Sequence, residues 1–257
     1  MLSQIIETKL DEIEALTLPA AIDVEKKSLF NSLQASNREL ALIAEVKKAS
    51  PSKGIIKEDF RPVDIAKGYE RGGADAISVL TDVQYFKGHR DYLTAIKQNV
   101  TLPILRKDFI ISELQIEESV LIGADAILLI AAVFEPKRLK ELYDLAYSKG
   151  LECLVEVHSP KELEEMLALF TPQIIGVNNR NLKTFETSLQ QTEEISQYIP
   201  KESLFISESG IHTFADTERV KKAGANGVLV GESLMRAKTP EHGIVELLGD
   251  VNVESKA

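Results

Sequence analysis

The chain alternates, from Leu40 onward, short apolar runs rich in β-branched residues with longer amphipathic runs. The short runs, typical of strands, begin at Ala41, Asp75, Pro103, Asp125, Glu152, Ile174, Ser203 and Gly227. The runs between them have helical spacing, as at 63–72, 113–123, 137–150 and 214–224, with a last one near 241–248. Alternating strands and helices imply a parallel sheet. Eight such units in about 210 residues predict an α/β protein with a single (β/α)8 TIM barrel. A doubly wound open sheet is the alternative that periodicity leaves open.

A faint internal repeat supports this division. The segments GGADAISV, GADAILLI and GANGVLVG begin at Gly72, Gly123 and Gly224. In each segment a glycine is expected to end a helix, since glycine adopts the left-handed conformation after a helix without steric cost. A strand follows directly, and we interpret the residues that begin two of these strands, Asp75 and Asp125, as solvated strand ends.

The residues before the alternation predict a separate helical segment. Apolar side chains at helical spacing from Ile5 to Leu16 predict a helix over 2–16, and a second helix is expected over 24–35. We therefore divide the single domain into an N-terminal helical extension over the barrel mouth, 1–40, and the barrel, 41–257. The first residues are acidic and lack the apolar centre of a signal peptide.

Charge and cysteine content narrow the classes of partner. The net charge is −10, so the surface field repels nucleic acids and anionic membranes, and we expect neither as a partner. No apolar run reaches the length of about 18 residues that a membrane span needs. The single cysteine, Cys153, excludes an intramolecular disulfide and fits a reducing compartment, so we expect a cytoplasmic protein.

Polar residues interrupt the predicted strands near their C-terminal ends. Barrel strands are covered on both faces and should be nearly all apolar. The exceptions are Glu45, Lys47, Lys107, Glu156, Asn178, Arg180 and Glu208. Residues two apart share a strand face, so Glu45 and Lys47 are expected on one side, with the others in the same mouth. A lone charge at a strand end is usually solvated, and Glu45 and Lys47 can simply pair. Five strands with the same departure instead predict an acid–base site.

Glycines and hydroxyl residues suggest a phosphate site at the same rim. SPSKG, beginning at Ser50, follows the first strand, and SESGI and VGESL place Gly210 and Gly231 after the seventh and eighth strands. Barrels commonly bind phosphate there through backbone N–H groups.

Other residues are set aside. Cys153 alternates opposite to Glu156, so we expect a buried thiol facing the helices. The four histidines lack metal-ligand spacing. His158 is close to the rim and could support a rim residue, but a surface-loop role is favoured. No G-x-G-x-x-G motif follows a strand, so nicotinamide binding is unsupported.

The ordered motifs AEVKKASPSKG, LRKDFI, LVEVH, GVNNRNL, SESGI and LVGESLM resemble the indole-3-glycerol-phosphate synthase family, from Leu40 to about Leu248. The chain has no room for a second fused barrel, so it resembles the monofunctional form. The resemblance implies a carboxy-lyase of tryptophan biosynthesis. The expected reaction is ring closure, decarboxylation and dehydration of 1-(2-carboxyphenylamino)-1-deoxyribulose 5-phosphate, in a monomer without metal or other cofactor.

The resemblance also implies roles for individual residues. Lys107 resembles the general acid that protonates the substrate carbonyl. A lysine near another cation and an apolar wall can have its pKa lowered toward the working pH. Glu156 resembles the acid/base of proton removal and dehydration. Lys47 resembles the lysine that holds the substrate carboxylate and can share in proton transfer. Orienting roles are implied for Glu45 and Asn178, phosphate-side contacts for Arg180, Ser50, Lys53, Gly210 and Gly231, and places in the mouth for Glu208 and Ser209. The expected apolar wall is Phe86, Phe109, Leu128 and Leu229. Glu232 departs from family members with a small hydroxyl residue there, so its side chain is expected to point away from phosphate.

Three alternative functions fit the sequence less well. Phosphoribosylanthranilate isomerase needs a cysteine base, and Cys153 is on the wrong strand and face. A metal-dependent phosphosugar epimerase needs a His/Asp set at the rim, which is lacking. A non-catalytic phosphosugar-binding protein would keep the phosphate glycines but would not need Lys107 or Glu156.

Overall fold

The chain forms a closed parallel barrel in the computed structural model, which describes residues 2–181, 184 and 186–249. Within these residues the barrel strands are β1 (Ala41–Val46), β4 (Ala76–Leu80), β5 (Ile104–Lys107), β6 (Ala126–Ile130), β7 (Glu152–Val157), β8 (Ile174–Asn178), β9 (Leu204–Glu208) and β10 (Gly227–Val230). Each strand pairs in parallel with its neighbours in sequence order, and β1 closes the barrel between β10 and β4. The (β/α)8 prediction is confirmed, and the open sheet is excluded.

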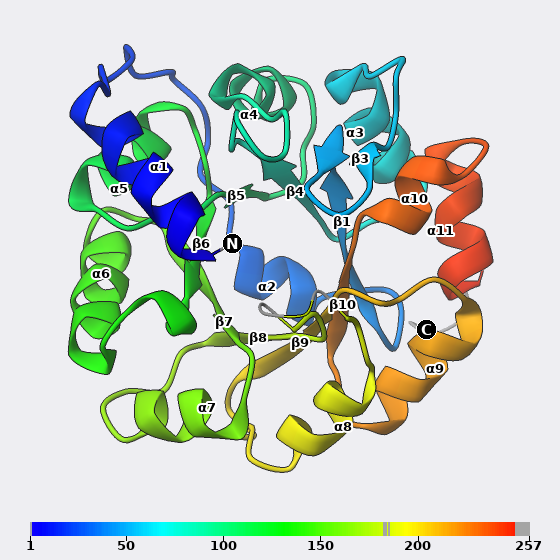
Figure 1. Cartoon of the computed structure of the whole chain (residues 1–257). Coiled ribbons are helices and arrows are strands. Elements are labelled where there is room, and N and C mark those ends of the chain that lie inside the picture. The colour runs from blue at the N-terminus through cyan, green and yellow to red at the C-terminus, as the bar shows by residue number, and fades with distance from the viewer. Residues whose placement is uncertain (1, 182–183, 185, 250–257) are drawn as a thin grey trace.

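Helices surround the barrel (Figure 1). They are α3 (Pro62–Arg71), α4 (Arg90–Lys97), α5 (Glu113–Leu121), α6 (Pro136–Ser148), α7 (Pro160–Leu167), α8 (Gln190–Ser196), α9 (Phe214–Lys222), α10 (Glu232–Arg236) and α11 (Pro240–Leu248). A 3-10 turn, η1 (Ala131–Val133), precedes α6, and the loop after β1 carries a small hairpin of β2 (Ala49–Ser50) and β3 (Gly54–Ile55). Within the described part of the chain, no helix is long and apolar enough to cross a membrane.

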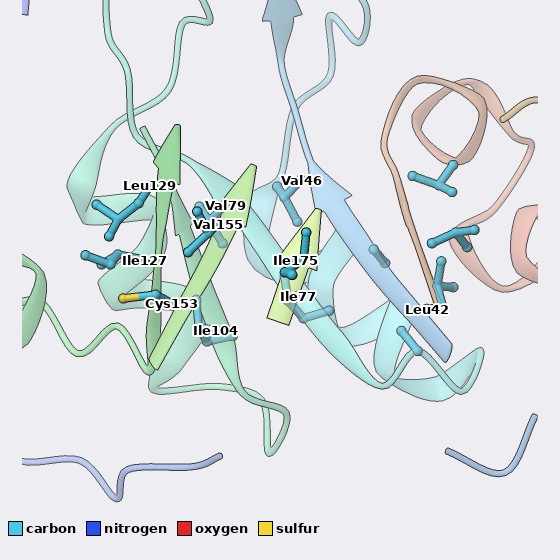
Figure 2. Packing of buried hydrophobic residues seen from close by; sticks show 14 of the residues in the cluster. Leu42, Val46, Ile77, Val79, Ile104, Ile127, Leu129, Cys153, Val155 and Ile175 are labelled. Atoms are coloured by element: carbon cyan, nitrogen blue, oxygen red, sulfur yellow. The ribbon is translucent and has the colours of Figure 1, made fainter. Parts of the chain in front are cut away.

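Alternation along the strands produces two apolar layers. One lies inside the barrel and includes Ile43, Leu105 and Leu154. The other lies between strands and helices (Figure 2), where Cys153 packs as predicted and burial raises the pKa of its thiol. Each fully buried leucine or isoleucine contributes about 1.5–3 kcal/mol. These layers fix the strands, so the side chains at the strand ends have a rigid support.

The two N-terminal helices lie at opposite ends of the barrel. Helix α1 (Leu2–Glu14) approaches the C-terminal ends of the strands, where Leu2 and Ile5 line a pocket. Helix α2 (Leu29–Gln34) inserts Leu29 and Leu33 into the inner layer from the other end, and Figure 1 shows it within the ring of strands. The boundary at residue 40 stays a prediction, and Met1 and 250–257 lie outside the described residues.

The second N-terminal helix is shorter than predicted. The expectation of a helix from residue 24 is wrong, because Ser28 caps α2 by accepting a hydrogen bond from the Asn31 backbone. Just before it, the Lys27 N–H donates to Asp125 (2.8 Å) instead of entering a helix. These hydrogen bonds at the N-terminal ends of the strands therefore determine where α2 begins.

The aspartates at the strand starts are anchors. Asp125 is 1% exposed and accepts hydrogen bonds from Lys97 Nζ and the Ile104 N–H, each at 2.7 Å. Asp75 accepts from the Leu42 N–H at 2.8 Å. The prediction of solvated strand ends is therefore wrong, because each carboxylate binds groups of neighbouring elements. The preceding repeat glycines do adopt left-handed backbone, as at Gly123, whose φ is 90°.

Candidate active site

The predicted rim residues gather around one pocket at the C-terminal ends of the strands. Lys47, Lys107, Asn178 and Arg180 lie at or just beyond strand ends, and side chains from neighbouring strands complete the wall. The predicted residues that line the pocket are Glu45, Lys47, Ser50, Phe86, Lys107, Phe109, Leu128, Glu156, Asn178, Arg180, Glu208, Ser209, Gly210, Leu229 and Gly231. Lys53 is the predicted residue outside this set, with a side chain that is 52% exposed.

Lys107 is held between two carboxylates at the centre of the pocket. Its Nζ lies 3.3 Å from Glu156 Oε2 and 3.4 Å from Glu208 Oε2. Burial disfavours the ammonium, but Glu156, Glu208 and Glu45 outweigh burial and raise its pKa. The expectation of a lowered lysine pKa is therefore wrong, because carboxylates rather than a second cation are the nearest charges. Lys107 is therefore protonated at neutral pH.

Glu156 and Glu208 are driven to opposite protonation states. Burial alone would raise the pKa of Glu156, but Lys107 and then His158 and Asn178 hold it well below its usual range. Burial, with added repulsion from Glu156 and Glu45, raises the pKa of Glu208 to about 8 despite Lys107. At neutral pH the pocket therefore carries one ionised and one protonated glutamic acid beside the same lysine, a pattern suited to proton transfer.

Replacing Glu208 by glutamine is expected to change how stability depends on pH. The pKa of Glu208 is higher in the folded state than in the unfolded chain. The contribution of the protonated Glu208 to the free energy of unfolding is therefore fully present below the unfolded value near 4.5 and is lost as pH rises through about 8. Glu208→Gln removes this loss, so its Tm should increasingly exceed that of the wild type between about pH 5.5 and 8.5. Calorimetry at about pH 5.5 and 8.5 measures the difference in Tm between Glu208→Gln and the wild type. The substitution Glu202→Gln, at an exposed position, is the control. Parallel Tm curves for Glu208→Gln and the wild type would contradict the assignment.

Glu45 and Lys47 form an ion pair inside the pocket. Lys47 Nζ lies 2.6 Å from Glu45 Oε1, and the side chains are 16% and 6% exposed respectively. The nearby Gly231 has a backbone φ of −122°, so its conformation does not demand glycine. A Cβ at Gly231 would instead lie 2.3 Å from Glu45 Oε1 and 3.0 Å from Lys47 Nζ. The glycine therefore makes room for this pair.

Gly231→Ala is expected to displace the Glu45–Lys47 pair and to lower turnover by roughly 10²-fold, the cost of a misplacement of about 1 Å in an active site. The φ of Gly231 lies outside the left-handed region that favours glycine, so Tm should fall far less than activity. Steady-state kinetics and thermal unfolding of the same sample check this. Turnover equal to that of the wild type would show that the pair has freedom to move.

Arg180, Ser209 and Gly210 form another side of the pocket. Arg180 Nη1 donates to Ser52 Oγ (3.0 Å), which links β8 to the hairpin loop after β1. Ser209 and Gly210 have left-handed backbones, with φ of 66° and 76°. Such a conformation is uncommon for a serine and tends to occur at functional turns. Glu232 Oε1 accepts from Arg236 Nε (3.0 Å) and lies 4.0 Å from Lys53 Nζ.

The predicted apolar wall lines the pocket beside these charges. The Phe86 and Phe109 rings are 6.3 Å apart between centroids and are tilted by 40°. The Phe86 N–H donates to Asp82 Oδ1 (3.0 Å), which fixes the loop after β4. Leu128 and Leu229 also line the pocket, from β6 and β10. Such a surface can hold a flat aromatic group next to the lysines.

A buried ionic cluster under α1 is not among the features that the sequence predicts. Lys9 is 2% exposed, and its Nζ lies 2.8 Å from Asp82 Oδ2 and 2.9 Å from Asp108 Oδ1. Asp108 also lies 3.5 Å from Arg106. Asp82 lies two residues after β4 and Asp108 directly follows β5, so this cluster joins α1 to the loops that carry Phe86 and Phe109. A lysine on a short amphipathic helix gives no local signal of such partners.

His158 contacts a rim residue, which is the alternative that the sequence leaves open beside a surface loop. Its side chain is 7% exposed, with Nε2 only 3.2 Å from Glu156 Oε1, so the surface-loop prediction is wrong. The strand alternation that faces Glu156 inward also turns this residue, two positions on, toward it. Among the described residues, no group of three or more His, Cys, Asp or Glu side chains is arranged to hold a metal ion.

The fold and pocket define a (β/α)8-barrel enzyme with an acid–base site in its mouth. The family model described as indole-3-glycerol phosphate synthase matches residues 2–247. A protein of that name from Halalkalibacterium halodurans is 62% identical over 257 residues, covering 100% of both chains. Another from Priestia megaterium is 61% identical over 250 residues, covering 97% of this chain and 98% of the relative. The chain belongs to the indole-3-glycerol phosphate synthase family.

Solved structures with low sequence identity share the fold alone. A 3-hexulose-6-phosphate synthase superposes with a TM-score of 0.63 at 15% identity, covering 83% of this chain and 100% of the other. A thiamine phosphate pyrophosphorylase from Pyrococcus furiosus gives 0.60 at 16% identity, covering 82% and 95%. Barrels with one fold carry different chemistries, so function must be argued from the pocket.

Proposed function

We propose that this protein catalyses the indole-3-glycerol phosphate synthase reaction, a step of tryptophan biosynthesis. The substrate is 1-(2-carboxyphenylamino)-1-deoxyribulose 5-phosphate, which undergoes ring closure, loses CO₂ and then loses water. The observation that carries the proposal is the half-buried Lys107 ammonium between Glu156 and Glu208 in the mouth of a family member. We expect the enzyme to act as a monomer. The single cysteine fits a cytoplasmic enzyme.

Ring closure requires an acid at the ketone oxygen. Lys107 donates its proton to the ketone oxygen as the ring carbon attacks the ketone carbon. Protonation of the oxygen makes the ketone carbon a better electrophile. The substrate's carboxylate and its own phosphate bring negative charge into a pocket that is already acidic. Lys47 holds the carboxylate until CO₂ leaves and the bonding electrons return to the ring. Binding must be moderate, since only interactions that strengthen in the transition state raise turnover.

Dehydration requires removal of a ring proton and departure of hydroxide as water. Glu156, kept ionised, accepts the carbon-bound proton, and an acid beside it protonates the leaving hydroxyl. Glu45 and Asn178 orient the substrate hydroxyls and the lysines. The phosphate is proposed to bind near Arg180, Ser50, Lys53, Gly210 and Gly231, with Glu208 and Ser209 beside it. Phe86, Phe109, Leu128 and Leu229 hold the aromatic ring.

Mass spectrometry of the product tests the proposal against its alternatives. Incubation with the carboxyphenylamino-deoxyribulose phosphate should give a product lighter by one CO₂ and one water. An unchanged substrate with saturable binding would instead indicate a binding protein. Conversion of phosphoribosylanthranilate without loss of mass would indicate the isomerase, although Cys153 packs behind the strands, away from the pocket.

A further inference from the structure

His158 contacts the oxygen of Glu156 that Lys107 does not. Its Nε2 lies 3.2 Å from Glu156 Oε1, whereas Lys107 Nζ lies 3.3 Å from Oε2. Glu156 is 2% exposed, so both contacts occur away from water. His158 is not among the described residues that line the pocket, so it is placed to act on a substrate only through Glu156.

A second carboxylate lies on the other side of the imidazole. His158 Nδ1 lies 3.6 Å from Glu162 Oε2, in the first turn of α7. The same oxygen accepts the His158 backbone N–H at 2.8 Å. The His158 carbonyl accepts a hydrogen bond from Gln191 Nε2 of α8 (2.6 Å). Elements on both sides therefore fix the residue, and Glu156 and Glu162 are the charged groups that contact its ring.

The imidazole is positively charged at neutral pH. Burial disfavours the charged form, but Glu156 and Glu162 outweigh burial and raise the pKa of His158 to about 9. Glu156 thus has two cations beside it, and burial is the opposing influence on its pKa. If Lys107 were the single cation, Glu156 would lose its compensating charge when Lys107 donates a proton. A buried carboxylate without a cation tends to take up a proton.

We propose that His158 is a positioning residue, which holds Glu156 in place and keeps it ionised while Lys107 gives up its proton. The inference rests on the proposed function, in which Lys107 acts as acid and Glu156 later accepts a proton from carbon. The proton of Lys107 then goes to the substrate oxygen instead of the neighbouring carboxylate. Glu162 completes the arrangement by orienting the imidazole.

The first experiment follows the histidine ring protons by NMR over pH in the enzyme without substrate. The chain has four histidines, and the His158→Gln variant assigns the resonance by its loss. The expected result is a His158 titration near pH 9, moved lower by Glu162→Gln. A titration near the ordinary value of about 6.5 would overturn the inference. This readout needs no turnover, so its failure is distinct from failure of the proposed function.

The second experiment compares the pH dependence of kcat. In His158→Gln the acid limb should move to higher pH by about one unit or more, because Glu156 protonates more easily. At neutral pH kcat should fall about tenfold, because Glu156 loses a contact that holds it in place, while KM changes less than about threefold. The deficit should shrink above pH 9, where wild-type His158 loses its own proton. A kcat profile that superimposes on the wild type would overturn the inference.

His242→Gln is the matched control. Its Nε2 lies 3.2 Å from Glu246 Oε1, the distance found for His158, but the His242 side chain is 54% exposed on α11. Its kcat profile should equal that of the wild type. If His158→Gln fails to fold, Glu162→Gln carries the kinetic test: the same direction of change, smaller in size, supports the inference. An unchanged profile in folded Glu162→Gln, with an unmoved His158 resonance, would overturn it.

Discussion

Lys107→Met is expected to lower kcat by at least about 10²-fold, within the 10²–10⁴ range of general acid–base catalysis. Methionine keeps much of the side-chain length but removes the proton that the ring closure needs. It also leaves Glu156 and Glu208 without the ammonium now 3.3 and 3.4 Å away, so both carboxyl groups should protonate more readily. Product binding should weaken far less than kcat falls, because the phosphate and apolar contacts remain.

Steady-state kinetics and fluorescence titration with the product separate these two effects. Lys161→Met, at an α7 lysine whose side chain is 81% exposed, is the control and should match the wild type. If folded Lys107→Met turns over at nearly the wild-type rate, Lys107 is not the acid.

Lys9→Met is expected to cause a large loss of stability. It leaves Asp82 and Asp108 buried without the ammonium that lies 2.8 and 2.9 Å from them. Breaking a buried pair by removing one partner costs about 3–5 kcal/mol. For a chain of this size each kcal/mol lowers Tm by about 2–4 °C, so a fall of roughly 6–20 °C is expected. Activity should also fall, since α1 and the loops carrying Phe86 and Phe109 lose their common anchor.

The pH dependence identifies the cause of this loss. Burial raises the pKa of Asp108, but Lys9 and Arg106 outweigh burial and hold it low. Its stabilisation is present above the unfolded pKa and is lost as pH falls through the folded value. The difference in Tm between Lys9→Met and the wild type should therefore shrink toward acid pH. Glu7→Ala, at an exposed position of the same helix, should leave Tm unchanged. A Lys9→Met Tm equal to the wild-type value would exclude the anchor.

The barrel was predictable because its signals are local. Strand runs, helix spacing and the repeat glycines each depend on neighbouring residues, and they recur along the chain. Strand alternation likewise faces Glu45, Lys107 and Glu156 toward one pocket, as predicted. The (β/α)8 topology follows once alternating units and a parallel sheet are recognised.

The errors concern partners distant in sequence. Lys9 meets Asp108, and Lys27 meets Asp125, across about one hundred residues, and no periodicity encodes either contact. The sequence places two lysines at one rim, which predicts a lowered lysine pKa. In the structure Lys47 pairs with Glu45, and the carboxylates around Lys107 raise its pKa. The sequence favours a loop role for His158 because it does not show that Glu162 lies beside the ring. That position depends on the residue at which α7 begins.

The most direct test of the proposed function is a continuous fluorescence assay. Purified protein is mixed with 1-(2-carboxyphenylamino)-1-deoxyribulose 5-phosphate, without added metal or cofactor, and indole emission is followed. We expect a steady rise in indole emission that depends on enzyme concentration and is nearly abolished in Lys107→Met. No rise above the enzyme-free sample, from protein shown to be folded, would contradict the proposed function.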